Sequence, residues 1–272
     1  MSQKIKNSVI AVIALVIFSG CEDYATKVDM PKVEKKIVVQ SFISPDDATV
    51  SALLTWSKPI IGTKDWEEME VILNATVIIS DGVKSEILIW NLSEQLYEIS
   101  TSVFPIEAGK KYYLTVSTPD GKQVRSSCEV PSSKNTTLVF NKNDTSIVEQ
   151  LITVSFRYRD HEPGKSNYFR LMGKNDLDYS DFYGDGEYKA DSDLDDDNIF
   201  KFSFYFYGSN NPEKAKAWLI NCDYNYFQYH KTLQAAEYNY GIFTEPSLIY
   251  SNVEGGLGCF GAYNSYEIET DL

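Results

Sequence analysis

The densest group of side chains that could do chemistry is an acidic run between positions 176 and 197. Two parts of it have the composition of calcium loops, because aspartates alternate there with other residues. One part contains Asp181 and Asp185 together with glycines, and the other contains Asp191, Asp193 and Asp195. Hard cations need six to eight oxygen ligands, and the candidate ligands are Asp181, Asp185, Asp191, Asp193 and Asp195. Neither part has EF-hand spacing. The plainer interpretation is a solvated loop whose like charges keep it extended.

Tyrosine is the second residue type that could take part in binding. Fifteen of the nineteen tyrosines follow residue 150. Aromatic rings with a polar tip suit sugar faces, peptides and protein partners, because they offer a large and rigid contact area. Tyr179, Tyr183 and Tyr188 fall in the acidic run and are the candidate contact residues. Tyrosines in strands and in the helix are better explained as core residues.

Cysteine and histidine give little support for a reactive centre. Beyond position 21 the chain has Cys128, Cys222 and Cys259, an odd number. In an oxidising compartment this predicts one disulfide, Cys222–Cys259, and one free thiol. No Cys-x-x-Cys pair is present, and His161 and His230 are far apart and lack ligand spacing, so we expect no zinc site.

Catalytic motifs are also missing from the sequence. It has no Gly-x-Ser-x-Gly, no phosphate-binding glycine loop and no His-Glu-x-x-His. Paired carboxylates could be drawn from so many acidic residues that their presence indicates nothing. We therefore expect a protein that is not an enzyme and that needs no cofactor other than the calcium considered above.

The first twenty residues have the pattern of a lipoprotein signal peptide. Two lysines precede an apolar run over 9–18, which is too short to span a membrane but is typical of a signal sequence. Ser-Gly-Cys follows. The pattern predicts that 1–20 is removed and that Cys21 carries fatty-acyl chains, with 21–35 as a tether. An ordinary signal peptide or a membrane anchor is the alternative.

Charge excludes one class of partner. After removal of 1–20, 39 acidic residues face 23 basic ones, an excess of 16 negative charges. Such a surface repels phosphates, so we expect no nucleic-acid partner.

The elements that must position these side chains are mostly strands. Between 36 and 131, short alternating segments are separated by turn signals, of which Asp81-Gly82 and Pro119-Asp120-Gly121 are the clearest. This predicts an immunoglobulin-like β-sandwich. Residues 131–135 read as a linker.

A second β-rich domain is expected over 136–272. Phenylalanines at every other position from 200 to 206 predict a strand with one buried face. One helix is expected near 223–240, because tyrosines recur there at three- and four-residue spacing after Asp223, a good capping residue. The predicted fold is mainly β, with two sandwich domains of which the second carries one helix.

Four parts of the chain resemble the domain-of-unknown-function family 4249, lipoproteins of Bacteroidota. They are the glycine-rich end over 245–263, the tyrosine-rich helix over 223–233, the first strand over 36–40 and the segment 75–82. Cys259 departs from the family, which carries an apolar residue there. Acidic residues after Cys21 resemble the export signal to the outer face of the outer membrane.

The resemblance implies a function without catalytic residues. We expect a lipid-anchored accessory or binding subunit on the cell exterior, whose partners are the outer membrane and a TonB-dependent receptor or another barrel. The alternative is a structural or adhesive surface module, stabilised by calcium. An enzyme such as a peptidase or glycosidase is a third class, and it would need a deep cleft with reacting groups in reach.

Overall fold

Strand β1 (Ile37–Ile43) shows how the sequence forms this fold. Its residues alternate between buried and half-buried positions, as the two-residue period of a strand requires. Strand β2 (Thr49–Trp56) alternates in a similar way as far as Leu54, after which Thr55 is buried too, and it pairs with β1 in antiparallel register. The computed structural model describes residues 34–58, 69–132, 138–143, 149–157, 165–175, 187–193, 199–207, 214–237 and 247–271.

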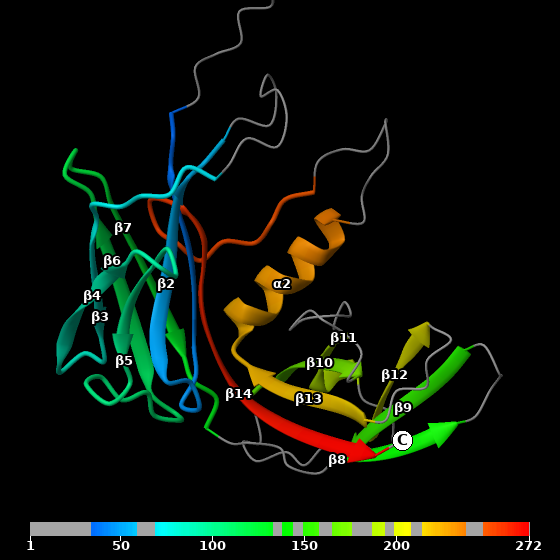
Figure 1. Ribbon diagram of the computed structural model, residues 1–272. Helices are drawn as coiled ribbons and strands as arrows, with labels where there is room; N and C mark the ends of the chain where they lie inside the picture. Colours follow the sequence, from blue (N-terminus) through cyan, green and yellow to red (C-terminus); the bar gives the residue numbers. More distant parts are fainter. Residues whose placement is uncertain are drawn as a thin grey trace, which may run out of the picture. The chain divides into compact units, whose positions relative to one another are not determined.

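Eleven of the described strands are hydrogen-bonded into one sheet, in the order β11-β10-β13-β14-β1-β2-β5-β4-β3-β6-β7 (Figure 1). The strands not yet defined in it are β3 (Thr76–Ser80), β4 (Ser85–Asn91), β5 (Leu96–Ser100), β6 (Lys111–Ser117), β7 (Gln123–Glu129), β10 (Tyr168–Asn175), β11 (Glu187–Ala190), β13 (Lys214–Cys222) and β14 (Leu257–Asp271). A separate three-stranded sheet has the order β12-β9-β8, with β8 (Leu138–Asn143), β9 (Glu149–Arg157) and β12 (Ile199–Tyr207).

The two expected turns are confirmed. At the β3–β4 hairpin, Asp81 Oδ1 accepts the N–H groups of Val83 and Lys84 at 2.9 and 2.7 Å, and Gly82 has a φ of 88°. At the β6–β7 hairpin, Gly121 also has a φ of 88°. Glycine adopts these positive φ values without steric cost, so each turn follows from its local sequence.

Among the described residues, the largest core is made by strands β1 to β7 together. Its members include Val39 and Leu54 from β1 and β2, and Val77 and Leu114 from β3 and β6. Phe260 of β14 belongs to the same core. Residues from β1 to β7 therefore share one apolar core, and β14 near the C-terminus contributes to it.

Helix α2 (Tyr224–Glu237) confirms the expected helix and its cap. Asp223 Oδ1 accepts the N–H of Tyr226 at 2.8 Å, the usual N-cap hydrogen bond. Tyr226, Phe227 and Tyr229 are buried, so the tyrosine stripe does pack against the sheet. Among the described residues, no helix is both long enough and apolar enough to cross a membrane.

The mainly β class is confirmed, and the division into two sandwiches is not. Strand β14 pairs in parallel with β1, from Val38↔Leu257 to Ile43↔Ala262, and in antiparallel register with β13. Hydrogen bonding therefore runs continuously from the late strands into the early ones. The linker expected over 131–135 and the domain boundaries stay predictions.

Candidate functional site

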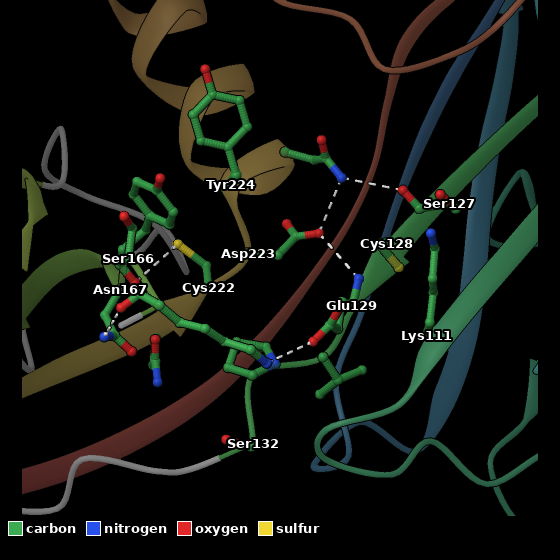
Figure 2. Close-up of a pocket in the computed structure, with 16 residues that line it drawn as sticks. Lys111, Ser127, Cys128, Glu129, Ser132, Ser166, Asn167, Cys222, Asp223 and Tyr224 are labelled. Atoms are coloured by element: carbon green, nitrogen blue, oxygen red, sulfur yellow. Dashed lines mark hydrogen bonds and ion pairs between the residues drawn. The ribbon is translucent and has the colours of Figure 1, made fainter. Parts of the chain in front are cut away.

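A cavity of about 420 Å³ lies where strand β7 ends and helix α2 begins (Figure 2). Four segments form it: the start of β6, the end of β7 with the residues after it, the start of β10, and the end of β13 with the first turn of α2. Most lining side chains are polar. They belong to Lys111, Ser127, Cys128, Glu129, Val130, Pro131, Ser132, Lys165, Ser166, Asn167, Tyr168, Asn221, Cys222, Asp223, Tyr224 and Asn225.

Asp223 connects the walls of this cavity. Besides capping α2, its carboxylate accepts the backbone N–H of Ala262 at 3.3 Å and that of Glu129 at 3.4 Å. The amide of Asn225 donates to it at 3.2 Å. One side chain therefore joins the helix, β14 and the end of β7.

Burial dominates the electrostatics of Asp223. Removal of the carboxylate from water raises its pKa to about 6, against the lowering effect of the N–H groups of Tyr226, Ala262 and Glu129. Burial also raises the pKa values of the Cys128 and Cys222 thiols well above their ordinary value, and the nearby Asp223 charge adds to this. These thiols are poor nucleophiles, because only the thiolate reacts.

The rim of the cavity carries charged and aromatic side chains. Lys165 Nζ lies 3.1 Å from Glu129 Oε1, and this exposed ion pair crosses between two walls (Figure 2). The rings of Tyr168 and Tyr224 meet edge to face with centroids 5.4 Å apart. Tyr224 is also in edge contact with Tyr250 at 5.8 Å. The site therefore combines hydrogen-bonding groups with aromatic rings.

A second cluster of aromatic rings surrounds His230 on α2. Its ring centroid lies 4.3 Å from that of Tyr226 and 4.8 Å from that of Phe42. Nε2 is buried and has no hydrogen-bond partner. Burial, helped by the positive charge of Arg170, lowers the pKa of His230 to about 3. The imidazole is neutral at physiological pH and acts as a packing group.

The glycine-rich end of the chain is a point of close backbone contact. A Cβ added at Gly256 would lie 2.6 Å from the carbonyl oxygen of Ile37, and one at Gly258 would overlap the backbone of Val39. A Cβ at Gly261 would lie 3.0 Å from the backbone of Tyr226. These glycines let β14 approach β1 and α2 where a side chain would clash.

Asn252 continues this packing toward the cavity. Its amide donates to the carbonyls of Ser127 and Phe260 at 3.2 and 2.8 Å, and its Oδ1 accepts the N–H of Phe260 at 3.0 Å. Asn252 therefore joins β14 to β7.

The predicted contact and metal residues are described only in part. Cys21, Tyr179, Tyr183, Asp181, Asp185 and Asp195 lie outside the described residues. Asp191 and Asp193 form a short 3-10 helix (Asp191–Asp193), and Asp193 Oδ2 accepts the N–H of Ala190 at 2.9 Å. Within the described ranges no group of three metal-ligating side chains occurs, and the calcium prediction stays a prediction.

Tyr188 is placed differently from the expected loop contact. It lies in β11, pairs opposite Arg170 of β10 and is half-buried. Its ring is in edge contact with Phe227 at 6.0 Å, and the Arg170 guanidinium lies 5.4 Å from its centroid. The strand pairing turns this ring toward the helix, where it packs against Phe227 and stays partly exposed.

The predicted disulfide Cys222–Cys259 is wrong for this structure, because both cysteines and Cys128 are free. Cys222 pairs opposite Tyr263 of β14, four positions from Cys259. Four residues of extended strand span about 13 Å. A disulfide needs Cα atoms within about 7 Å.

The cavity itself was not predicted from the sequence. Asp223 was singled out only as a helix cap, and Glu129, which contacts it, carries no local signal. The only available hint was the polar stretch around 165–167 ahead of a strand. Asn225 and Tyr224 fell within the tyrosine-rich helix.

Comparisons with solved structures give weak similarities. A two-domain fibronectin type-III segment from chicken tenascin aligns at 9% identity over 69% of this chain and 91% of its own, with a TM-score of 0.22. Trypsin-activated alpha-2-macroglobulin from Escherichia coli aligns at 11% identity over 70% of this chain and 14% of its own, with a TM-score of 0.25. Scores this low carry no argument about the fold. None of the curated proteins matches the chain.

The comparison with protein families gives a clear result. Residues 23–269 match the family described as "Domain of unknown function (DUF4249)". The match spans nearly every element described above, from β1 to β14, and it includes the glycine-rich end that packs β14 against β1. The chain therefore belongs to the DUF4249 family.

Proposed function

We propose that the protein is an outer-membrane lipoprotein, anchored through Cys21 and facing the cell exterior. It acts there as a non-enzymatic accessory or binding subunit of a TonB-dependent receptor or another barrel complex. The observation that carries the proposal is the lipoprotein pattern of 1–21, followed within two residues by the family match that starts at 23. The matched part is the part that would remain after processing.

The chemistry of the cavity supports binding over catalysis. A catalytic carboxylate must be open to the reacting atoms, but the Asp223 carboxylate already accepts four hydrogen bonds that join structural elements. A catalytic cysteine needs a lowered pKa, and burial raises that of Cys128 and Cys222. The polar groups of the cavity are thus arranged to hold walls and to contact a ligand.

We further propose that strands β1 to β7 pack as a sandwich. Supporting this, buried residues of β1 and β2 share one core with those of β3 and β6, although these pairs are separated in the sheet by β5 and β4. Two layers with facing apolar sides would produce such a core. A rigid sandwich of this kind suits a surface module that presents a binding site.

A membrane extraction experiment tests the location and the partner. The wild-type chain and a Cys21→Ala variant are expressed in the native host with a C-terminal tag, and outer membranes are solubilised in detergent. We expect the wild type to incorporate a labelled fatty acid and to co-purify with a barrel protein. The variant should leave the membrane fraction. Labelling that is absent from the wild type would contradict the anchor, and recovery without any barrel would contradict the partner.

A further inference from the structure

One end of the early strands is the place where the described chain begins. Ile37 at the start of β1 pairs opposite Trp56 at the end of β2. On the other side of β1, Val38 pairs opposite Leu257 at the start of β14. Figure 1 shows this end at the top, where the blue start of β1 and the cyan segment before β3 lie. We call it the entry end, because the chain enters the sheet here from its N-terminal segment.

The segment 69–73 carries exposed apolar side chains at the entry end. A backbone hydrogen bond of 2.9 Å from the Ile72 N–H to the Leu54 carbonyl holds it along the end of β2. Ile72 is buried, whereas Met69 and Leu73 are 67% and 59% exposed. Neighbouring side chains of an extended segment point to opposite sides, so the pairing that buries Ile72 also turns Leu73 outward. The exposure of Leu73 therefore follows from the backbone hydrogen bonding.

Other parts of the molecule expose apolar side chains too. Leu257 adds a third such residue at the entry end. Val83 and Val103 are exposed in turns at the opposite end of the strands, and Ile87 and Ile89 are exposed on β4. Single exposed apolar residues are ordinary on a protein surface. Exposure alone therefore does not select a contact surface, and the connection of the entry end to the N-terminal segment has to decide.

The length of this connection favours the bilayer as the occupant. Under the proposed processing Cys21 carries the acyl chains, and Lys35 follows it by about fourteen residues. A chain of that length spans at most about 50 Å even when fully extended. Among the exposed apolar groups, those at the entry end are attached nearest to the bilayer, and a short connection raises the effective concentration of the bilayer surface there. A weak apolar contact can then persist.

The charges at this segment favour apolar contact over electrostatic attraction. Glu70, which lies between Met69 and Leu73 in the sequence, forms an ion pair with Lys35. These two charges compensate each other, and the mature chain as a whole carries an excess of 16 negative charges. Anionic lipid would repel such a chain. Attraction to a bilayer must therefore come from the apolar side chains.

We propose that the entry end rests on the bilayer that holds the acyl chains, with Met69, Leu73 and Leu257 buried at the boundary between headgroups and hydrocarbon. Amphipathic helices bury their apolar faces in the same boundary. The proposal deepens the membrane location proposed above and rests on the anchor at Cys21 for its biological setting. It names the surface that faces the lipid, which an anchor alone does not fix.

Hydrogen exchange on tethered vesicles tests the proposal. A histidine tag replaces Cys21 and holds the mature chain on phosphatidylcholine vesicles that contain nickel-chelating lipid, so no acylation is needed. Mass spectrometry follows amide exchange in the tethered and in the free chain. We expect exchange in 69–73 to slow by about threefold or more on the vesicles, and exchange in the turn 81–84 at the opposite end to change by less than about 1.5-fold. Added phosphatidylglycerol should not increase the effect.

Variants then locate the contact. Met69→Ser combined with Leu73→Ser should bring the exchange rates of 69–73 in the tethered and the free chain to within about 1.5-fold of each other. Val83→Ser combined with Val103→Ser removes two exposed apolar side chains at the opposite end, so it is the matched control and should keep the slowing. All variants carry the same tag and are first required to match the wild type in melting temperature within a few degrees.

Three results would overturn the proposal. They are unchanged exchange in 69–73 on the vesicles, equal slowing in 81–84 or in β4, and slowing that survives the double serine variant of 69 and 73. If a barrel protein covers this segment instead, lipid alone should have no effect and that variant should lose the barrel in the pull-down, which also overturns the proposal.

The anchor and the contact surface can fail separately. Because the tag replaces Cys21, slowing on the vesicles by a chain that fails fatty-acid labelling would contradict the anchor alone. A labelled chain whose exchange in 69–73 is unaffected by lipid would contradict the contact surface alone.

Discussion

Asp223 and Glu129 are 94 positions apart in the sequence and are joined by a hydrogen bond of 3.4 Å from the Glu129 N–H to the Asp223 carboxylate. The same carboxylate caps helix α2 at Tyr226 and accepts the N–H of Ala262 in β14. The contact therefore links the part of the chain before residue 131 to the part after 214 through a single ionisable group. Its protonation state should be visible in the stability of the whole protein.

The first prediction concerns the pH dependence that Asp223 produces. Its pKa is about 6 in the folded protein and 3.8 as the ordinary value, so between these pH values the folded state binds more protons than the unfolded state. The contribution of this group to the free energy of unfolding therefore falls as pH rises from about 4 to about 6, by an amount on the order of 3 kcal/mol.

Asp223→Asn tests this, because asparagine keeps an N-cap oxygen and removes the charge. Urea unfolding of wild type and variant is measured from pH 4 to pH 7. The free energy of unfolding of the wild type relative to the variant should decline with rising pH and level off above about 6. A difference that is constant with pH would show that the carboxylate is not buried as described.

The second prediction is that His230 acts with the opposite sign. Its pKa is about 3 in the folded state against an ordinary value of 6.5, so the unfolded state binds more protons between these values. The stability that depends on neutral His230 is present above about pH 6.5 and is lost as pH falls toward 3. His230→Phe should make the protein less sensitive to acid, since phenylalanine suits a site between Phe42 and Tyr226.

The same unfolding series measures this effect. Between pH 6.5 and pH 4, the free energy of unfolding of His230→Phe should fall by several kcal/mol less than that of the wild type, because a pKa shift of this size corresponds to such a difference. Because Asp223 and His230 oppose each other in this range, wild-type stability should change less with pH than that of Asp223→Asn. If the wild type lost stability in acid as steeply as Asp223→Asn, this would contradict the opposing effects of Asp223 and His230.

Local features of this fold could be predicted from the sequence, and distant contacts could not. Asp81-Gly82, Pro119-Asp120-Gly121 and the Asp223 cap act on backbone groups within three residues, so their chemistry is visible in the chain. The parallel pairing of β14 with β1 joins residues more than two hundred positions apart. No local pattern encodes that partner, and the prediction of two separate sandwiches missed it.

The candidate site shows the same limit. Glu129, Lys165 and Asn221 come from three segments and carry no motif, so the cavity exists only after the sheet has brought them together. Tyr188 was expected in a solvated loop because acidic residues surround it in the sequence. Its pairing with β10 instead places the ring against Phe227. This placement follows from the strand register, which amino-acid composition does not predict.

The third prediction concerns a buried tyrosine hydroxyl. Tyr97 is 2% exposed; its Oη accepts the N–H of Ala75 at 2.8 Å and donates to the carbonyl of Ile72 at 2.9 Å. Tyr97→Phe leaves both backbone groups without this partner, which should lower the free energy of unfolding by about 1–3 kcal/mol. Tyr113→Phe, at a position 43% exposed, is the control and should stay within about 0.5 kcal/mol of wild type. Equal effects of the two changes would refute the role of the Tyr97 hydroxyl.

The fourth prediction is that Cys128, Cys222 and Cys259 are unreactive thiols in the native protein. All three are free and buried, and burial raises their pKa values. In a Cys21→Ser variant, Ellman's reagent should label none of them until urea unfolds the chain, after which all three should react. Mass spectrometry without reduction should find no Cys222–Cys259 linkage; a linked peptide would restore the pairing expected from the sequence.

The fifth prediction separates two roles of glycine. Gly258 has a φ of 99°, and an added Cβ would overlap the backbone of Val39, its partner in the β1–β14 pairing. Gly121 has a φ of 88°, but an added Cβ there would meet nothing within 4 Å. Gly121→Ala should therefore cost only the backbone strain, about 1–2 kcal/mol. Gly258→Ala must also push β14 away from β1.

We expect Gly258→Ala to lower the free energy of unfolding by more than about 4 kcal/mol, or to leave too little folded protein to measure. Urea unfolding followed by circular dichroism compares the two variants with the wild type, and soluble yield provides the second readout. Because the β1–β14 pairing is what joins the late strands to the early ones, its loss should also abolish a single cooperative transition. Equal costs for the two substitutions would mean that β14 does not approach β1 as closely as its register requires.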